Sequence, residues 1–296
     1  MKKDKTTLII VLFFFMGLSV LLYPTISNLY NRRVQSRAIV DYDTVIKNYD
    51  DSKYSEILNE AEAYNQEIMK LEDPFNTYDT IDNYEKVLNI DNTGMMGYIE
   101  IDKIDVKLPI YHGTSNGVLS KAVGHLEGSS LPIGGIGNHT VLSAHRGLPS
   151  ATLFTDLDKL EKGDIFTITI LNQKLTYEID QILIVEPDKI DELQINSGHD
   201  YVTLITCTPY GINTHRMLVR GSRIENTLEE YVTTEAYKIN SLMIIPLVAL
   251  PIILILVLII MFKPIKKKDI DKNKYLYPSK YKAKKKSSEV MDNEEK

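Results

Sequence analysis

The stretch YVTLITCTPYGINTHRMLVRGS, residues 201–222, contains two runs of β-branched and other apolar residues around a turn with proline and glycine. The runs Tyr201–Thr206 and Met217–Ser222 are typical of strands, so we expect a β-hairpin here. This hairpin returns Arg216, at the start of the second strand, to the side of Cys207. Cys207 stands where a strand opens into a loop, which is a common position for catalytic groups.

Five similar runs lie upstream of this hairpin, and turn signals such as Asn138 separate them. The runs are Met96–Ile101, Val106–Tyr111, Thr140–Ala144, Ile165–Leu171 and Leu175–Ile184. Seven or eight short strands with few helices between them predict a barrel or a sandwich of roughly 130 residues.

A helical region precedes the strands, within residues 26–71. Apolar side chains recur there at spacings of three and four, which places them on one helical face. They are Ile57, Ala61, Tyr64, Ile68 and Leu71. The pattern stops at Asp73-Pro74, because a residue before proline is pushed out of the α conformation. Residues 73–93 are polar and rich in turn signals, with a short helix expected near Asn83–Leu88.

Two uncharged segments bracket this body. Leu8–Tyr23 has 16 residues and follows three lysines. This is short of the ~20 residues that cross a bilayer, so the apolar region of a signal peptide is the alternative to a membrane anchor. No cleavage site of the A-x-A type follows, which favours an uncleaved signal anchor. Leu242–Phe262 has 21 uncharged residues and predicts a second transmembrane helix.

The charges are segregated along the chain. Residues 1–6 carry a net charge of +2 and residues 263–296 carry +6, whereas the 256 residues between them carry −14. By the positive-inside rule, we expect a cell-membrane protein with both termini in the cytoplasm and residues 24–241 outside. An acidic body excludes non-specific nucleic-acid binding, which needs clustered Lys and Arg. The basic tail is interpreted as a topology signal.

The chain has one cysteine, Cys207. This excludes an intramolecular disulfide and argues against a cysteine-rich zinc site. A lone cysteine is commonly a small buried apolar residue. Outside the cytoplasm, however, an unpaired thiol is a liability unless it is used, so a structural and a reactive role both remain open.

A thiol with a pKa near 8.5 needs a histidine and a positive group nearby to become an efficient acyl-transfer nucleophile. Among six histidines, His145 ends an apolar strand and has the same strand-to-loop position as Cys207. We interpret His125 and His139 as turn or surface residues and His199 as a solvated loop residue. No spacing of the HExxH type indicates a metal site, and no cofactor is implied. Arg216 can stabilise an oxyanion, with a surface ion pair as the alternative.

These residues resemble the sortase family. Thr203-Leu204-Ile205-Thr206-Cys207 is similar to the TLxTC signature of sortases, and His215-Arg216 falls where the family places its catalytic arginine. Further blocks resemble class C, the pilin-polymerising sortases, and the resemblance covers roughly residues 70–225. The blocks are residues 97–101, 123–130, 142–147 and 153–157.

The resemblance implies a mainly β fold: a sortase-like closed eight-stranded β-barrel with short helices, an N-terminal helical extension with a lid, and two flanking transmembrane helices. The expected regions follow in chain order. They are a cytoplasmic N-terminus (1–6), a signal anchor (7–23), an extracytoplasmic extension (24–72), a lid region (73–93), the barrel (94–226), a linker (227–241), a transmembrane helix (242–262) and a basic tail (263–296).

The resemblance also implies a mechanism. Cys207 attacks the Thr–Gly bond of an LPxTG-type sorting signal, Arg216 stabilises the oxyanion, and His145 acts as general acid and base. A lysine of the next pilin then takes the acyl group, giving an isopeptide bond. In the lid motif Asp73-Pro74-Phe75, Asp73 is expected to face Arg216 and Phe75 to cover Cys207.

Two other functions remain as alternatives. The first is a sortase that attaches surface proteins to peptidoglycan. The second is a non-catalytic membrane scaffold. The lid and the second apolar segment argue against the first, and the presence of Cys207, His145 and Arg216 argues against the second.

Overall fold

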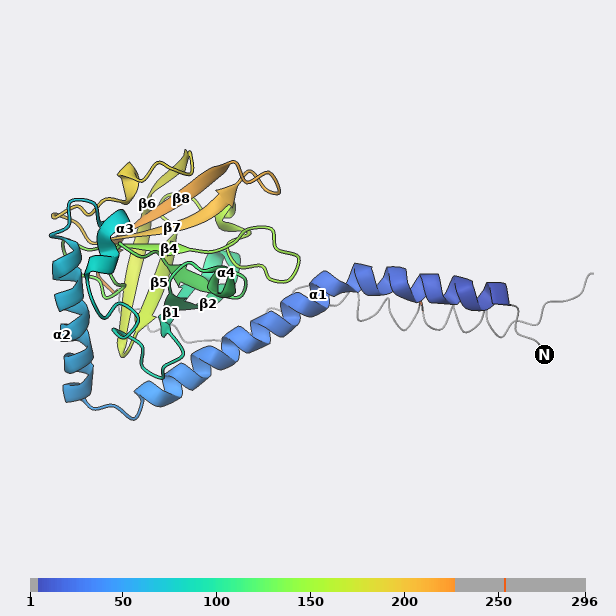
Figure 1. The fold of residues 1–296 in the computed structure, drawn as a ribbon, viewed down its shortest axis with the longest axis horizontal. Coiled ribbons are helices and arrows are strands. Elements are labelled where there is room, and N and C mark those ends of the chain that lie inside the picture. The colour runs from blue at the N-terminus through green and yellow to red at the C-terminus, as the bar shows by residue number, and fades with distance from the viewer. Residues whose placement is uncertain (1–4, 227–252, 254–296) are drawn as a thin grey trace, which may run out of the picture. The chain divides into compact units, whose positions relative to one another are not determined.

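The computed structural model describes residues 5–226 and residue 253 (Figure 1). The predicted linker 227–241, the basic tail 263–296 and the first four residues lie outside the described residues, and so does the predicted helix Leu242–Phe262, apart from residue 253.

Eight strands form a closed barrel in the order β1-β2-β3-β4-β7-β8-β6-β5. The fold is therefore mainly β, as predicted. The strands are β1 Met95–Ile101, β2 Val106–His112, β3 Val123–His125, β4 His139–Ser143, β5 Ile165–Ile170, β6 Gln173–Val185, β7 Tyr201–Thr208 and β8 His215–Ile224. Most neighbours are antiparallel, but β2 with β3 and β4 with β7 are parallel.

All seven predicted strands are present within a few residues of their expected bounds, and β3 is the strand that the sequence pattern missed. It has three residues and includes Gly124, so it shows no alternation of apolar and polar side chains. A Cβ atom at Gly124 would lie 2.4 Å from the carbonyl oxygen of Gly113, so this glycine lets the β2–β3 crossover pack closely.

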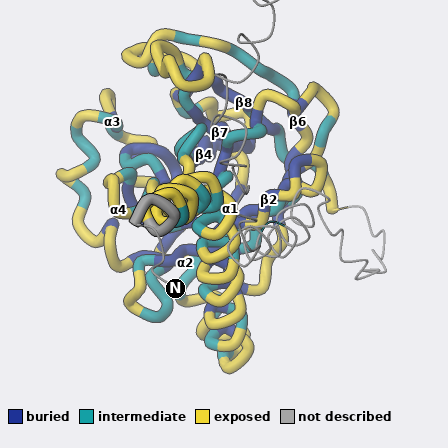
Figure 2. Tube along the Cα trace, turned by 90° about the vertical axis from the view of Figure 1, so that its right-hand side faces the viewer, coloured by how far each residue is buried: buried dark blue, intermediate teal, exposed yellow. Residues whose placement is uncertain are grey.

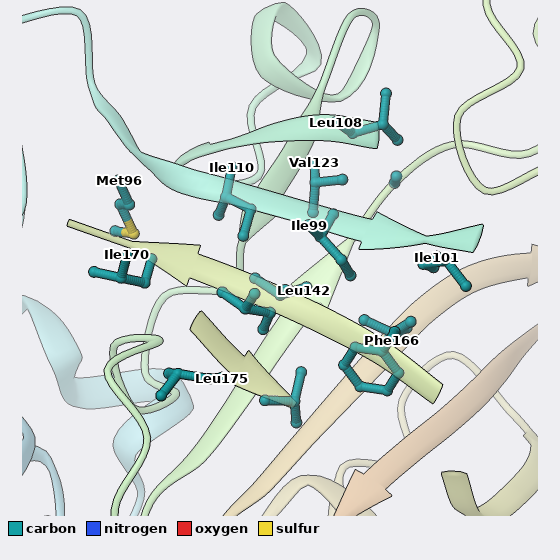
Figure 3. Close-up of a cluster of buried hydrophobic side chains, with 14 of the residues drawn as sticks. Met96, Ile99, Ile101, Leu108, Ile110, Val123, Leu142, Phe166, Ile170 and Leu175 are labelled. Carbon is teal, nitrogen blue, oxygen red and sulfur yellow. The ribbon is translucent and has the colours of Figure 1, made fainter. Parts of the chain in front are cut away.

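The barrel interior is filled with aliphatic and aromatic side chains. Figure 3 shows Ile99, Ile110, Val123 and Leu142 among the side chains that gather between the strands, and each of these four is fully buried. Complete burial of a side chain of this size contributes roughly 1.5–3 kcal/mol. This core fixes the strand ends at which the candidate site residues lie.

The short helices lie in the connections between strands. They are α4 Asn116–Leu119 and the single 3₁₀ turns η2 Asp102–Ile104, η3 Leu157–Lys159 and η4 Asp191–Leu193.

A single long helix, α1 (Lys5–Ile46), starts the described chain. Pro24 lies inside it, so the predicted boundary between residues 23 and 24 is not an end of the helix. Its C-terminal half docks on the barrel through a buried stripe at helical spacing, Gln35, Ile39, Tyr42 and Ile46. The Tyr42 hydroxyl donates to the Met96 carbonyl at 2.9 Å and accepts from the Leu171 amide at 2.8 Å.

The N-terminal half of α1 is apolar and exposed, and Figure 2 shows most of the helix in the colour of exposed residues. This helix is long and apolar enough to cross a membrane, which indicates membrane anchoring.

The second helix, α2 (Asp51–Ile68), begins at Asp50, whose carboxylate accepts from the Lys53 amide at 2.8 Å. The predicted helical face is confirmed at Ala61, Tyr64 and Ile68, which are buried.

Residues 73–93 contain α3 (Pro74–Thr77) and the 3₁₀ turn η1 (Tyr78–Thr80), followed by turns. The helix predicted near Asn83–Leu88 is wrong. Both end residues have positive φ angles, 78° at Asn83 and 61° at Leu88, and a right-handed helix cannot include this conformation.

Candidate functional site

Cys207 and Arg216 lie directly opposite each other in the antiparallel pair β7–β8. Opposed residues of such a pair have side chains on the same face, with Cα atoms ~4.5–5.5 Å apart. The predicted hairpin is thus confirmed, and its register brings the thiol and the guanidinium together. Cys207 is half-buried, so its sulfur is held by the sheet but remains accessible.

The guanidinium of Arg216 is attached to its own turn. One of its nitrogens donates to the carbonyl oxygens of Asn213 and His215, at 3.3 and 3.1 Å. No ion pair involves Arg216 among the residues that the structure describes, so the alternative of a surface ion pair is not observed there. An arginine whose charge is not neutralised by a carboxylate can stabilise a developing oxyanion.

His145 reaches the same place from β4. The parallel pairing of β4 with β7 matches Ser143 to Ile205, and it continues through the Ala144 amide, which donates to the Ile205 carbonyl at 3.1 Å. The Thr206 hydroxyl donates to the Ala144 carbonyl at 2.9 Å. These bonds join the residues that precede His145 and Cys207.

Cys207, His145 and Arg216 line one groove of about 490 Å³. Four buried apolar side chains form a cluster beneath it, Val141, Leu193, Ile205 and Leu218. The lining of a substrate groove was not assigned from the sequence. The missing signal is long-range, because these four side chains come from β4, β7, β8 and the β6–β7 connection.

Phe75 covers part of this groove. It lines the groove together with Cys207 and packs against the apolar cluster. The backbone beside it approaches Gly128, where a Cβ atom would lie 2.6 Å from the Pro74 carbonyl oxygen and 2.7 Å from the Phe75 Cα. Gly128 therefore forms a seat for residues 74 and 75, and the seat needs a residue without a side chain.

Asp73 does not make the contact that was expected for it. Its carboxylate accepts from the side chain of Asn76 at 2.8 Å, its carbonyl accepts from the Thr77 hydroxyl at 2.7 Å, and it is exposed. No Asp73–Arg216 ion pair is present within the described part of the chain. The residue is held locally because it begins α3.

Sequence reasoning did not identify Arg146, which connects the two chain segments that carry His145 and Cys207. Its guanidinium pairs with Asp158, donates to the Thr208 hydroxyl at 3.4 Å and lies 5.9 Å from the centre of the Tyr210 ring. It therefore bridges the loop that follows His145 and the strand end that follows Cys207. An arginine next to a candidate histidine was the available signal, but its partners are 12 to 64 positions away.

The interpretation of two other histidines, His125 and His139, as turn or surface residues is wrong. His125 and His139 are buried, with exposed fractions of 0% and 1%. Burial disfavours a charged imidazole, and it lowers the pKa of His125 to about 4 and also lowers the pKa of His139. Both are held by hydrogen bonds and serve the structure. His199 is exposed, as predicted.

No group of three or more His, Cys, Asp or Glu side chains in the described residues is arranged to hold a metal ion. The chemistry available in the groove is that of a thiol, an imidazole and a guanidinium.

Comparison with known proteins agrees with this geometry. The family model described as "Sortase domain" matches residues 99–224. Crystallised sortase C1 from Streptococcus agalactiae is 51% identical, with 64% of this chain and 99% of that one covered and a TM-score of 0.59. A sortase C of Clostridium perfringens, solved with the C-terminal cell wall sorting motif, is 48% identical, with 64% and 100% covered and a TM-score of 0.57.

Curated sequences give a more distant match. Sortase D of Bacillus subtilis is 34% identical over 131 residues, which are 43% of this chain and 63% of that protein. The matched part of the chain thus spans less than two thirds of the length of the curated relatives. The similarity to solved class C sortases extends over nearly their whole length, and on this basis the chain belongs to the sortase family.

Proposed function

We propose that this chain is a cysteine transpeptidase that cleaves LPxTG-type sorting signals and joins pilin subunits through lysine isopeptide bonds. The observation that carries the proposal is the register of β7 and β8, which sets Cys207 opposite Arg216 in the groove that His145 also lines. A nucleophile, a proton carrier and a fixed positive charge are the groups that acyl transfer needs.

In the first half-reaction, the Cys207 sulfur attacks the carbonyl carbon of the Thr–Gly bond. The Arg216 guanidinium stabilises the negative charge that develops on the carbonyl oxygen, because it carries a permanent charge at a fixed position. The C–N bond then breaks, and His145 supplies the proton that the leaving glycine amine takes. The product is a thioester between Cys207 and the donor threonine.

In the second half-reaction, a neutral lysine amine attacks the thioester carbonyl carbon. The carbon–sulfur bond breaks, the new C–N bond is an isopeptide bond, and the amine proton passes to His145. The imidazole gives up a proton in the first half-reaction and takes one in the second, so one histidine serves as general acid and then as general base.

Acceptor choice is supported by the relatives. The solved neighbours include a pilus-related sortase C of Group B Streptococcus, 43% identical with a TM-score of 0.55. Phe75 over the groove agrees with a lid of the class C kind. Pilin proteins with LPxTG-type signals are therefore the proposed partners, and peptidoglycan is the alternative acceptor.

The proposed location is the cell membrane, with two transmembrane segments and the barrel outside. It is supported by the exposed apolar half of α1, by the uncharged segment Leu242–Phe262, and by the lysines at both chain ends.

The test is a polymerisation assay with the full-length protein in detergent and a purified pilin. We expect a ladder of covalent oligomers on denaturing gels, which Cys207→Ala abolishes. Replacement of the acceptor lysine of the pilin should remove the ladder but leave cleavage of the sorting signal. Full cleavage by Cys207→Ala would overturn the proposed chemistry, and a ladder that survives lysine replacement would overturn the proposed acceptor.

A further inference from the structure

We propose that one end of the barrel rests on the lipid bilayer. This membrane-facing end consists of residues 146–153, which follow β4, and the β7–β8 turn, residues 209–214. This position of the barrel relative to the bilayer does not depend on the proposed transpeptidation.

Helix α1 is long enough to cross a bilayer and to continue onto the barrel. The helix is continuous from Lys5 to Ile46, and residues 6–31 contain no charged side chain. About 20 helical residues cross a hydrocarbon layer ~30 Å thick. Counted from Leu8, such a span ends at Ser27. The apolar run that looked too short is therefore extended by uncharged residues of the same helix.

Contact between α1 and the barrel begins at Asn28, the residue that follows this span. The Asn28 side-chain oxygen accepts from the amide and the hydroxyl of Thr152, both at 3.0 Å. One turn later, the Asn31 side chain donates to the Ser150 carbonyl at 2.8 Å. No linker separates the apolar part of α1 from these contacts, so residues 150–152 are held at the level where the helix leaves the bilayer.

The loop that follows β4 meets the β7–β8 turn at Tyr210. The Arg146 guanidinium lies over the Tyr210 ring, and a Cβ atom at Gly147 would lie only 3.0 Å from that ring. The two loops are thus in contact. In Figure 1, the loop that follows β4, the β7–β8 turn and the N-terminal half of α1 lie on the same side of the barrel.

The β7–β8 turn exposes large apolar side chains. Tyr210 and Ile212 are among the large apolar side chains that are exposed, with exposed fractions of 61% and 68%. Tyrosine is enriched at membrane–water interfaces, because its ring is apolar and its hydroxyl is polar. Arg33 is exposed on α1 just outside the counted span, where a charged side chain can stay in water.

This placement has a consequence for the site. Cys207 and Arg216 flank the β7–β8 turn, so the groove opens beside the bilayer surface. A membrane-bound substrate then has only a short distance to travel from its anchor to the thiol.

The experiment uses the full-length chain with Cys207→Ala, in vesicles of phosphatidylcholine and phosphatidylglycerol. Ile212→Cys carries an environment-sensitive fluorophore on the membrane-facing end. Ile136→Cys is the matched control, because Ile136 is an isoleucine with an exposed fraction of 80%, near the start of β4, at the opposite end of the barrel. We expect nitroxide groups on the lipid head groups to quench the Ile212 probe several-fold more than the Ile136 probe. Equal quenching of the two probes, or none at Ile212, would overturn the proposal.

A second variant tests whether α1 sets the placement. Asn28→Ala with Asn31→Ala removes the bonds to residues 150–152 and leaves the apolar run intact. Quenching of the Ile212 probe should fall, but only in part, because the buried stripe of α1 from Gln35 to Ile46 still docks on the barrel. Thermal unfolding should show that the barrel is still folded. Unchanged quenching in this folded variant would contradict the role given to the docking contacts.

Discussion

The β7–β8 ladder and residues 73–93 both border the groove, but they are held in different ways. In the ladder, Cys207 and Arg216 are one of eight consecutive residue pairs, so their separation is set by backbone hydrogen bonds. Residues 73–80 form two short helices that contact the barrel through Phe75 on the apolar cluster, Tyr78 on the main core and the seat at Gly128. The relative position of Cys207 and Arg216 is thus fixed by the fold, whereas the cover depends on a few contacts.

The second half of the same segment is anchored more firmly. The Tyr84 hydroxyl lies 2.9 Å from the His125 ring and accepts from the Gly113 amide at 2.9 Å. The His112 ring lies 2.8 Å from the Val87 carbonyl oxygen. Residues 73–80 are therefore the less firmly held half of the segment, because they rest on the barrel while the other half is bonded into it.

The largest effect is expected from a substitution in the β7–β8 ladder. Arg216→Lys keeps a positive charge but loses the planar fork, so it cannot reproduce both the bonds to the turn and the contact with an oxyanion. We expect cleavage of an LPxTG-type peptide to fall by about 10²–10³, the usual loss when an oxyanion donor is removed. The measurement is the rate of peptide cleavage, with thermal unfolding as the control for folding. A loss below about threefold would show that charge alone is sufficient.

The next effect concerns the anchored half and is a dependence on pH. The folded-state pKa of His125 is about 4, below its ordinary value of 6.5, because the ring is buried. Between these two values the unfolded chain binds a proton that the folded chain does not, so stability falls as the pH falls from 6.5 to 4. The loss is on the order of 3 kcal/mol by the standard conversion of a pKa difference.

Unfolding by denaturant across this pH range measures the effect. His139, whose pKa burial also lowers, acts in the same direction, and Asp200, whose pKa burial raises, acts against it. His125→Gln should therefore flatten the pH profile only in part. An identical profile in the variant would contradict the assignment to His125.

The sequence predicted the ladder side well and the cover less well, and the reason is physical. Strand periodicity and the Pro/Gly turn are local signals, so the hairpin that pairs Cys207 with Arg216 could be predicted from residues 201–222. The seat at Gly128 depends on a contact over more than 50 positions, which leaves no periodic pattern. The expected meeting of Asp73 with Arg216 rested on resemblance alone, and local hydrogen bonds hold Asp73 elsewhere.

A smaller effect should appear when the seat is filled. Gly128→Ala places a Cβ atom against the backbone of residues 74 and 75 and thereby displaces Phe75 from the groove. We expect thiol labelling of Cys207 to become about fivefold faster, which corresponds to a shift of about 1 kcal/mol between covered and open states. Gly163→Ala is the matched control. Gly163 also has a positive φ, +91° against +87° at Gly128, but it has no atom within 4 Å of the added Cβ. Equal labelling in the two variants would show that backbone strain, not the lost seat, is the cause.

The smallest effect is expected for Asp73→Ala. The substitution removes one exposed hydrogen bond to Asn76 and no ion pair of the described residues, so the cover should be weakened by about 0.5 kcal/mol, the low end of the range for one hydrogen bond. Labelling of Cys207 should then change by about twofold, and Asp79→Ala, which removes another exposed carboxylate from the same segment, gives the baseline. If labelling instead rises by tenfold or more, and Arg216→Lys abolishes that rise, then Asp73 pairs with Arg216 in solution. In that case an ion pair holds the cover in addition to Phe75 and the seat at Gly128. Residues 73–80 would then be held more firmly, and would differ less from the β7–β8 ladder, than their contacts indicate.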